Sequence, residues 1–558
     1  MNLLYIGNDP SKGSTVHPSY LAYRHVNPIL HAMKDRLTDL EVNNIVHGYR
    51  RSTFSLQALV TDYMHGEVPK HKIIKDDHYE AALQQVTKRF RPGEIYRPVS
   101  FPDLRYYPWT LPTSAEAPYT DSDYWKKYVT IKYKLGEIEN ERISFHNLYN
   151  EIFRHNREKI HRIKDGIYVD RHGHDLKYYN KAHARAHLVA KDDPDKIRMV
   201  FGVPKLLLMA ECMFLWPLVN YLVNNDGPML WGFETLKGGW YAMYNWMTIT
   251  EPRSATYLAF DWKSFDKRAQ FSVIDDLHQT LRSYMTFEHG YMPTHDYPDT
   301  MTSPHRLENL WNWMCNAVKH TPDVLPNGDT YVRQHAGIAS GYFQTQLLDS
   351  MYNMQILLTI LHKMGFNIEK MKIKVQGDDS IIGLTEYIPE QLHANFMTLF
   401  AQYAEDYFGA VLNVKKSKMS NTLDGLPLLG FTNRAGIPFK KRDELLANLL
   451  YPERKSDENR LMARTVGIAY ANCGSHPEVY RICEDIFTYL QNKGFSPNAQ
   501  GLPHLILALE DWYEIMTKEG ELRFPSFYET ICRLTDIPTR TVRQNEKLWP
   551  TTQFISRY

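Results

Sequence analysis

The chain has 558 residues, of which 43% are hydrophobic, so it is too long for one ordinary domain and can form two or three lobes with sizeable cores. Its 65 basic and 64 acidic residues give a net charge of +1, which argues against a protein that coats nucleic acid with its whole outer surface but permits a basic internal channel. The five cysteines are scattered without a CxxC pair, so neither a disulfide framework nor a zinc site is indicated, and a reducing compartment fits.

The N-terminal 120 residues carry no recognisable motif. The most apolar run of the chain, residues 206–223, is interrupted by Glu211, Pro217 and Asn220. Because polar residues and proline are costly in the middle of a membrane span, this run predicts a buried core helix, and we expect no contact with a membrane.

The segment around Lys196 and Arg198 alternates these two cations with Ile197 and Met199. In an extended chain alternate residues lie on the same side, so both cations can face one anionic group, such as a triphosphate. The alternative is an edge strand whose basic side chains face water.

A run of apolar, β-prone residues from Ala255 to Phe260 ends at Asp261, and Asp266 follows after the chain has turned toward a helix that includes residues 271–278. A buried strand that delivers a carboxylate at its C-terminal end is a common arrangement for a metal ligand. The alternative is that Asp261 caps the following helix.

Gly337 to Gly341 form a glycine-bracketed loop, and a helix is predicted to follow it as far as about Leu361. Four polar residues have roughly helical spacing and share one side of this helix: Ser340, Thr345, Asp349 and Asn353. The opposite side is apolar, at Phe343, Leu347 and Ile356. The polar stripe is therefore expected to face either water or a cleft.

Residues 371–384 have the pattern of a β-hairpin. Apolar residues alternate with polar ones through Met371, Lys372, Ile373, Lys374, Val375 and Gln376. This period of two predicts a half-buried strand, with Ser380–Leu384 as its return strand and Gly377, Asp378 and Asp379 as the turn. Two adjacent carboxylates repel each other, and a divalent cation between them relieves the repulsion. The alternative is a plain exposed turn.

After this hairpin we expect an amphipathic helix over residues 389–407, a strand and lysine-bearing loop over 410–419, and a second apolar strand over 426–432. From residue 443 onward the pattern is mostly helical and predicts a separate lobe. The C-terminal aromatic residues Trp549, Phe554 and Tyr558 are interpreted as packing residues.

Taken in order, these segments resemble the motif series of viral RNA-dependent RNA polymerases. The matching segments are Lys196-Ile-Arg198, Asp261-Trp-Lys-Ser-Phe-Asp266, Ser340-Gly-Tyr-Phe-Gln-Thr345, Gly377-Asp-Asp379, Leu412-Asn-Val-Lys-Lys-Ser417 and Leu428-Leu-Gly-Phe431. The local sequence is most similar to double-stranded RNA viruses of the partitivirus type, and the resemblance covers roughly residues 190–455.

The resemblance implies an α+β fold, a right-hand polymerase with an antiparallel palm sheet and helical fingers and thumb. The implied divisions are 1–245 for the fingers with an N-terminal fingertip region, 246–285 for the first part of the palm, 286–335 for an insertion of the fingers, 336–445 for the second part of the palm, and 446–558 for the thumb.

The resemblance also implies RNA-templated RNA synthesis by transfer of nucleotides at two metal ions. Asp261, Asp378 and Asp379 would hold Mg²⁺, with Mn²⁺ as a substitute, and Lys416 would be the general acid. The nucleotide-binding set would comprise Lys196, Arg198, Asp266, Ser340, Gly341, Thr345 and Asp349. Asp349 departs from many plus-strand RNA virus polymerases, which have asparagine at this position.

The expected partners are the RNA template and product, nucleoside triphosphates and the viral capsid protein, and the expected places of action are the virion interior and the host cytoplasm. Synthesis without a primer is expected. Two alternatives stay open: a non-catalytic RNA-binding or capsid-associated protein, and a reverse transcriptase. The second would favour an aromatic residue before the hairpin aspartates, where this chain has Gln376 and Gly377, and an aromatic gate near Asp266.

Overall fold

The computed structural model describes residues 1–558 except 15–25, 454–455, 503–516, 519–520, 537–539 and 557–558. At its centre is a four-stranded antiparallel sheet in the order β11-β6-β10-β9. The strands are β6 (Thr256–Ala259), β9 (Lys372–Gln376), β10 (Asp379–Leu384) and β11 (Lys418–Ser420). The predicted hairpin is therefore confirmed, with β9 and β10 as its arms.

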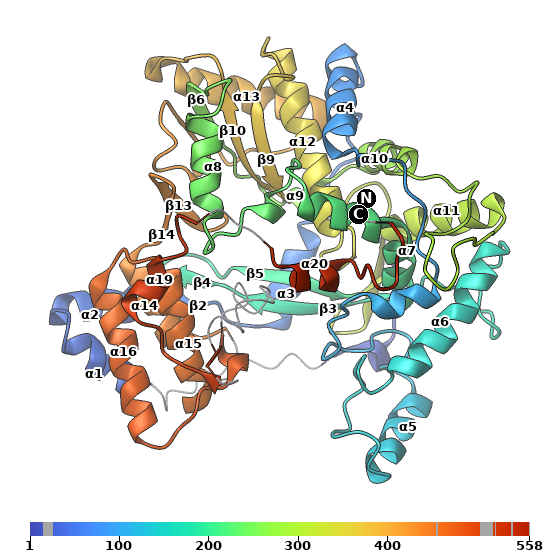
Figure 1. Ribbon diagram of the computed structural model, residues 1–558, viewed down its shortest axis with the longest axis horizontal. Coiled ribbons are helices and arrows are strands. Elements are labelled where there is room, and N and C mark those ends of the chain that lie inside the picture. Colours follow the sequence, from blue (N-terminus) through green and yellow to red (C-terminus); the bar gives the residue numbers. More distant parts are fainter. Residues whose placement is uncertain (15–25, 454–455, 503–516, 519–520, 537–539, 557–558) are drawn as a thin grey trace.

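The long helix α12 (Thr345–Lys363) packs against this sheet and is buried along most of its length. Around it lie α4 (Asp77–Phe90), α10 (Phe271–Ser283) and α13 (His393–Phe408) (Figure 1). Because α12 contacts all three helices and β9, its side chains form the middle of the largest apolar core.

Strand β9 differs from the prediction, because both of its faces are buried. Lys372 and Lys374 are 5% and 2% exposed, although the alternation placed them in water. The segment that covers them supplies their partners: Lys374 Nζ lies 2.5 Å from the Asp226 carboxylate, and Lys372 Nζ donates to the Thr250 carbonyl at 2.5 Å. Burial lowers the pKa of Lys374, and the charge of Asp226 opposes this effect.

A second sheet has the order β1-β8-β7-β3-β5. Its strands are β1 (Leu3–Asn8), β3 (Asn180–Ala186), β5 (Ile197–Gly202), β7 (Asp323–Val324) and β8 (Asp329–Arg333), and a short pair, β2 (Tyr49–Arg51) with β4 (Leu188–Ala190), lies in the same part of the chain. We expected helical fingers, but residues 1–245 contain strands as well as helices. Some of these strands pair with residues far along the chain, and no local sequence pattern reveals that pairing.

A buried ion pair and a buried asparagine fix this second sheet to the segment before α12. Arg333 and Asp323 form an ion pair at 3.3 Å, with 5% and 1% of each residue exposed, and the Arg333 guanidinium also donates to the Gly337 carbonyl. The Asn2 side chain accepts from the backbone amides of residues 334–336 and donates to the Ala336 carbonyl. These contacts hold the chain just before the predicted glycine-bracketed loop.

Helix α7 (Lys205–Asn224) is long and apolar enough to span a membrane by length and composition, and 78% of its most apolar window is buried inside the protein. The prediction of a buried core helix is confirmed. It packs against α6 (Tyr149–Lys164) and α11 (Pro304–His320). The ring of Trp216 in α7 contacts the buried rings of Trp549 and Phe554, which lie in the C-terminal segment after α20 (Val542–Leu548). These two aromatic residues are therefore packing residues, as expected. Tyr558 lies outside the described residues.

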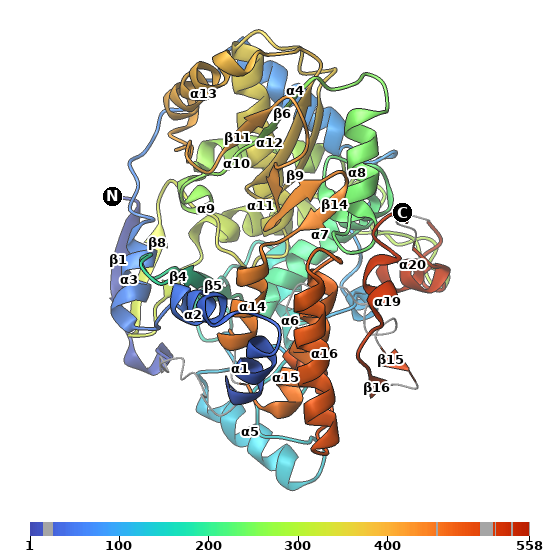
Figure 2. The ribbon, with the colours of Figure 1, turned by 90° about the vertical axis from the view of Figure 1, so that its left-hand side faces the viewer.

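The C-terminal region is mainly helical, as predicted, with α14 (Arg442–Leu450), α15 (Glu458–Ala471), α16 (Pro477–Asn492) and α19 (Phe527–Ile531). The N-terminal helices α1 (Val26–Lys34) and α2 (Asp39–Gly48) lie beside α14 and α16 (Figure 2). Residues of all these helices share one apolar cluster. The same cluster includes residues of β6, of β10 and of a small three-stranded sheet, which consists of β12 (Pro427–Leu428), β13 (Phe431–Arg434) and β14 (Ile437–Phe439).

Candidate active site

Asp261 lies two residues beyond the end of β6 and is held by the loop that precedes β11. Its backbone amide donates to Ser417 Oγ at 3.0 Å, and its carboxylate accepts from Asn413 Nδ2 at 2.8 Å. The residues that precede α9 (Phe265–Arg268) and α10 are Ser264 and Gln270, so Asp261 does not cap either helix. The carboxylate therefore stands at the strand end, as predicted.

The hairpin turn consists of only two residues, because Asp379 already pairs with Gln376 as the first residue of β10. Gly377 has a φ of +62°, which glycine adopts without strain, and Asp378 completes the turn. The prediction that all three residues form the turn is therefore wrong by one residue. The two aspartates still follow each other at the tip, next to the end of β6.

Asn353 of α12 connects this turn to the segment of Asp261. Its Nδ2 donates to the carbonyls of Gly377 and Asp378, both at 2.9 Å, and its Oδ1 accepts from the indole of Trp262 at 3.1 Å. Asn353 is fully buried. Within the polar stripe, Asn353 thus faces the hairpin and not water, whereas Ser340 and Thr345 are only half-buried.

The charge of Asp261 destabilises the charged forms of both hairpin aspartates. Desolvation by the surrounding protein raises the pKa of Asp379 to about 7, and the charges of Asp378 and Asp261 add to the effect, whereas Arg198 and the Leu429 amide favour the charged form. Water reaches Asp378, yet the surrounding protein and the charge of Asp261 raise its pKa as well. Asp261, Asp378 and Asp379 therefore form one acidic site, which a bound cation would stabilise.

The predicted pair of cations faces this site. Lys196 and Arg198 are exposed while Ile197 and Met199 are 7% and 5% exposed, so the alternation is confirmed. β5 is an edge strand, as the alternative interpretation expected. The cations are nevertheless close enough to the carboxylates to act on them: Arg198 opposes the rise in the pKa of both hairpin aspartates.

The pKa of Lys196 is lowered, first by the surrounding protein and then by the positive charges of Lys416 and Arg198, while Asp261 and Asp378 oppose the change. Lys416 is exposed in the turn that begins at Asn413, and its amide donates to the Asn413 carbonyl at 3.0 Å. Three cations from two separate segments thus converge on the carboxylates.

The glycine-bracketed loop before α12 is fastened to β5. The Phe201 amide donates to the Ser340 carbonyl at 3.0 Å, and Ser340 Oγ donates to the Met199 carbonyl at 3.1 Å. Gly341 has a φ of +132°, and a Cβ there would lie 2.3 Å from the Phe201 carbonyl oxygen. Only glycine fits this position, because both the backbone angle and the space exclude a side chain. Thr345 Oγ1 donates to the Ala339 carbonyl at 2.8 Å and fixes the start of the helix.

Asp266 and Asp349 form the remaining acidic part of the site. Burial raises the pKa of Asp349 well above its usual range, and the charges of Asp266 and Asp378 add to this effect. Within the described part of the chain, one oxygen of this buried carboxyl has no hydrogen-bond partner. Burial raises the pKa of Asp266 as well, although Lys267 and Arg198 oppose it. Burial thus favours the protonated form of Asp349, in which the carboxyl can donate as well as accept a hydrogen bond.

Glu211 is a site residue that the sequence interpretation treated only as an interruption in an apolar run. Its carboxylate accepts from the amides of Phe343 and Gln344 at 3.0 and 3.3 Å and from Gln344 Nε2 at 3.0 Å. Full burial raises its pKa to about 7. It satisfies backbone amides at the start of α12, where no helical partner exists. The sequence feature that could have revealed this residue is a single acidic side chain inside an otherwise apolar helix.

In the described residues, no three His, Cys, Asp or Glu side chains are already gathered into a ligand cage for a metal ion. The carboxylates of Asp261, Asp378 and Asp379 nevertheless fit a divalent cation, since the charge of Asp261 raises the pKa of both hairpin aspartates and all three side chains offer only oxygen ligands. Magnesium keeps several of its waters and needs only one or two carboxylates to bind, so a preformed cage is not required.

Adjacent carboxylates at the ends of antiparallel strands, opposed by cations and bordered by a glycine-bracketed helix start, are an arrangement that fits nucleotidyl transfer, the reaction of polymerases. A family model described as viral RNA-dependent RNA polymerase matches residues 163–486. The chain belongs to this family.

Two relatives extend the match. The chain is 32% identical over 603 aligned positions to the RNA-directed RNA polymerase of White clover cryptic virus 1 (isolate Boccardo/2004), covering 100% of this chain and 96% of the relative. It is 27% identical over 452 positions to the RNA-directed RNA polymerase of Atkinsonella hypoxylon virus (isolate 2H), covering 74% and 67%. The chain is accordingly an RNA-directed RNA polymerase that uses RNA and nucleotides as substrates, and the alternatives of a non-catalytic protein and a reverse transcriptase are set aside.

Proposed function

We propose that this polymerase joins nucleotides at a two-metal centre held by Asp261, Asp378 and Asp379. The observation that carries the proposal is the convergence of these carboxylates from β6 and the β9–β10 turn, opposite Lys196 and Arg198. Mg²⁺ is the proposed cofactor, with Mn²⁺ as a substitute. When bound, the ions stabilise the charge that develops on the attacking and leaving oxygens.

Lys196 and Arg198 are proposed to hold the triphosphate of the incoming nucleotide, because they are exposed on one side of β5 and their charges reach the carboxylates. An arginine and a lysine at neighbouring positions combine planar bidentate bonding with a movable point charge. Lys416 follows the hairpin aspartates in the sequence, and its charge acts on Lys196. It is proposed as the general acid that protonates the departing pyrophosphate.

Selection of ribose is proposed for the residues around the start of α12. They are Asp266, Ser340, Gly341, Thr345 and Asp349. The Ile338 amide donates to the Asp266 carbonyl at 2.9 Å, so the segment of Asp266 is joined to the glycine-bracketed loop that precedes α12. A neutral Asp349 carboxyl can donate to or accept from the 2′-hydroxyl, as the amide of asparagine does, and RNA selectivity is therefore compatible with the departure at this position.

We further propose the right-hand division of the chain. The fingers comprise 1–245 and 286–335, the palm 246–285 and 336–445, and the thumb 446–558. The contacts of α1 and α2 with α14 and α16 support a closed arrangement, in which N-terminal residues bridge from the fingers to the thumb. Primer-independent synthesis, association with the capsid protein, and action inside the virion and the host cytoplasm belong to the same proposal.

The test is incorporation of labelled nucleoside triphosphates on single-stranded RNA without a primer, in Mg²⁺, in Mn²⁺ and in EDTA. An Asp378→Ala plus Asp379→Ala variant should lose the product, and a matched Glu139→Ala plus Glu141→Ala variant, whose carboxylates are exposed away from the site, should keep it. Deoxynucleotides should be incorporated poorly. Equal product from the wild type and the Asp378, Asp379 variant would remove the support for this catalytic centre.

A further inference from the structure

Helix α3 (Leu56–Met64) lies against β5, the strand that carries Lys196 and Arg198 (Figure 2). In the described sheet β5 is the last strand and pairs with β3, so the backbone groups along its other edge need partners from outside the sheet. The residues that bind this free edge therefore decide where the two cations stand.

Two residues bind the free edge of β5. Ser340, from the glycine-bracketed loop, binds the carbonyl of Met199 and the amide of Phe201. The amide of Met199 donates to the carboxylate of Asp62, in the last turn of α3, at 3.3 Å. The edge strand is thus fastened both to the segment before α12 and to α3, directly beside Arg198.

Asp62 makes a second contact, with the segment of Asp266. Lys267 Nζ donates to the Asp62 carboxylate at 2.7 Å and to the Asp62 carbonyl at 2.5 Å. The side chains of Asp62 and Lys267 are 22% and 21% exposed, so the protein covers most of this ion pair. Lys267 directly follows Asp266 in the sequence. Met199 likewise follows Arg198, so a single carboxylate joins the neighbours of two residues in the nucleotide-binding set.

Helix α3 presents Asp62 from a fixed position. Leu59 and Tyr63 are 1% and 5% exposed, and the Tyr63 hydroxyl donates to the buried Asp323 carboxylate at 3.1 Å. Asp323 belongs to the buried ion pair of the second sheet. Because the last turn of α3 is anchored there, a shift of β5 relative to the segment of Asp266 would break a contact of Asp62.

We propose that Asp62 is a positioning residue for the incoming nucleotide. It holds the strand of Arg198 at a fixed distance from Asp266, so that the cations of β5 reach the triphosphate while the ribose lies beside Asp266. Binding groups on separate segments contribute fully only when their spacing matches the ligand. This inference rests on the roles proposed above for Arg198 and Asp266. It predicts an effect on nucleotide binding that a loss of stability alone would not produce.

The test is steady-state incorporation by the full chain on an RNA template, with the nucleotide and the template varied separately. Asp62→Asn keeps the size of the side chain but removes its charge and one acceptor oxygen, so one of the two donors loses its partner. The KM for nucleotides should rise about tenfold, with kcat and the KM for the template within about twofold of the wild type. The preference for ribonucleotides over deoxynucleotides should fall as well, since Asp266 is proposed to contact the 2′-hydroxyl.

Lys267→Met removes the ion pair but leaves the bond between the Met199 amide and Asp62, so the KM for nucleotides should rise by only about threefold. Because both substitutions break the same link, the double variant should be no worse than Asp62→Asn alone. Independent effects would multiply to about thirtyfold, and that result would overturn the proposal.

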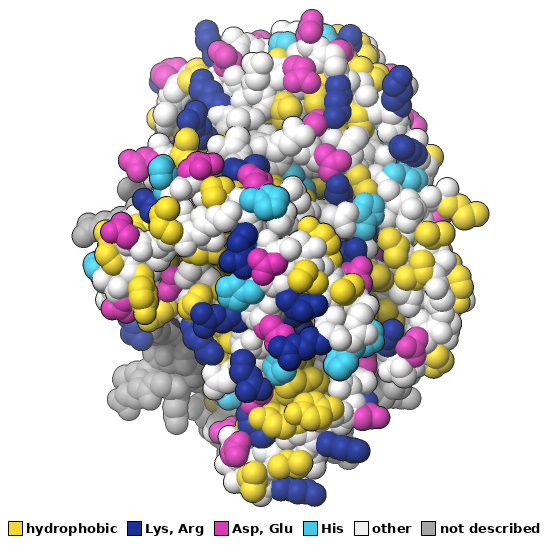
Figure 3. Space-filling model, turned by 90° about the vertical axis from the view of Figure 1, so that its right-hand side faces the viewer, with side chains coloured by type: hydrophobic (Ala, Val, Ile, Leu, Met, Phe, Trp, Pro, Cys, Tyr) yellow, Lys and Arg dark blue, Asp and Glu magenta, His cyan; other side chains and the backbone are white. Residues whose placement is uncertain are grey.

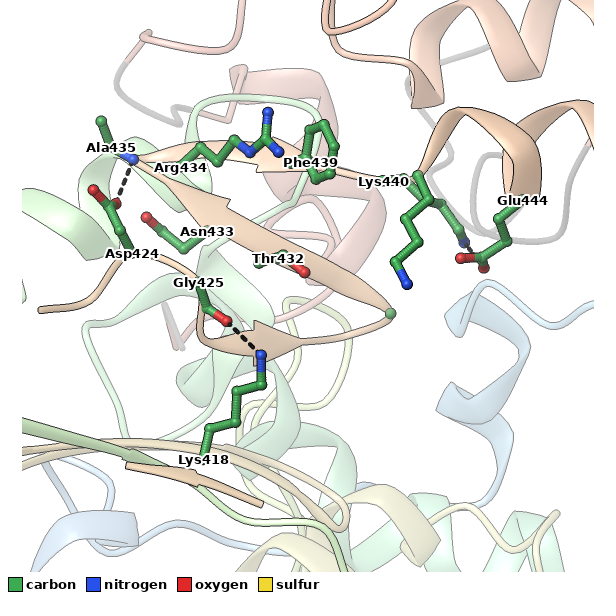
Figure 4. A pocket seen from close by; sticks show the side chains of 12 residues that line it. Lys418, Asp424, Gly425, Thr432, Asn433, Arg434, Ala435, Phe439, Lys440 and Glu444 are labelled. Carbon is green, nitrogen blue, oxygen red and sulfur yellow. Dashed lines mark hydrogen bonds and ion pairs between the residues drawn. The ribbon is translucent and has the colours of Figure 1, made fainter. Parts of the chain in front are cut away.

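Two control variants each remove one kind of contact elsewhere. Asp424→Asn removes a carboxylate that accepts from a backbone amide, that of Ala435 at 2.6 Å, beside the small three-stranded sheet (Figure 4). Glu158→Gln removes an ion pair with Arg171 on α6, which lies on the right-hand side in Figure 1, where charges of both signs are interspersed on the surface (Figure 3). Both variants should have the KM of the wild type, and thermal melting checks that every variant is folded at the assay temperature.

The outcomes separate this inference from the function on which it rests. An unchanged KM for nucleotides in folded Asp62→Asn, beside a raised KM in Lys196→Gln plus Arg198→Gln, would overturn the positioning role alone. An unchanged KM in the Lys196, Arg198 variant would overturn the proposed function and the positioning role together. A rise in the KM for the template alone would make Asp62 an RNA contact, contrary to the proposal. If Asp62→Asn does not fold, an unchanged KM in Lys267→Met would overturn the positioning role instead.

Discussion

Asn353 joins the turn of Asp378 to the segment of Asp261, and its replacement by leucine tests what this link contributes. Leucine has a similar shape but cannot form any of the three hydrogen bonds. Two buried groups, the Trp262 indole N–H and the Gly377 carbonyl, would lose their partner. At about 1–3 kcal/mol for each buried polar group left unpaired, the free energy of unfolding should fall by about 2–6 kcal/mol.

The assay is chemical denaturation together with nucleotide incorporation across a range of Mg²⁺ concentrations. Because the link sets the spacing between the carboxylates, Asn353→Leu should need more Mg²⁺ for half-maximal incorporation at a temperature where it is fully folded. Trp262→Phe is the control: it removes the indole N–H and part of a buried ring, so it should cost about 1–3 kcal/mol, but Asn353 keeps its hydrogen bonds to the turn and the Mg²⁺ requirement should change little. An Asn353→Leu enzyme within 1 kcal/mol of the wild type, with the same Mg²⁺ dependence, would refute the reasoning.

Three further changes address other parts of the site. Gly341→Ala places a Cβ 2.3 Å from the Phe201 carbonyl oxygen at a φ of +132°, so it should cost about 1–3 kcal/mol in urea denaturation and reduce incorporation; a fully active, equally stable variant would contradict the close contact. Arg333→Met leaves Asp323 as a buried unpaired charge and should cost about 3–5 kcal/mol, most of which should return when Asp323→Leu is added; a double variant no more stable than the single one would exclude the ion pair as the cause. Because burial raises the pKa of Glu211 to about 7 from an ordinary value of 4.5, the folded state binds the extra proton between these pH values, and stability falls as pH rises through this window. The difference in Tm between the wild type and Glu211→Gln should therefore shift against the wild type from pH 5 to pH 7.5, and a constant difference would show that Glu211 does not titrate there.

The strand ends that carry Asp261 and Asp378 could be predicted from the sequence because the pattern around them is local. An apolar run that ends in aspartate, and a hairpin with glycine at its turn, depend on backbone geometry over a few residues. The alternation of Lys196 and Arg198 with apolar neighbours was equally local, and the structure confirms it.

The contacts that complete the site could not be predicted in this way, because they join distant segments. Alternation predicted that the lysines of β9 face water, because it cannot show that the chain around Asp226 returns to cover Lys374. The same limit applies to Asn353: helical spacing assigned it to a polar side of α12, whereas its function as a link depends on Trp262 and on the hairpin, both far away in sequence. Hydrophobic periodicity describes one element at a time, and its partners are decided by the whole fold.

The shared apolar cluster of α1, α2 and the C-terminal helices has a consequence for how the protein is made. On the ribosome, α1 and α2 emerge first, but their partners in α14 and α16 extend to residue 492. At roughly 5–20 residues per second, the apolar faces of the first two helices wait about 20–90 s for the surface that covers them. Throughout that interval they are exposed to water in the nascent chain, the condition in which unfinished proteins aggregate or bind chaperones. Completion of this lobe is thus among the last steps of synthesis, and the first helices to be made are among the last to be buried.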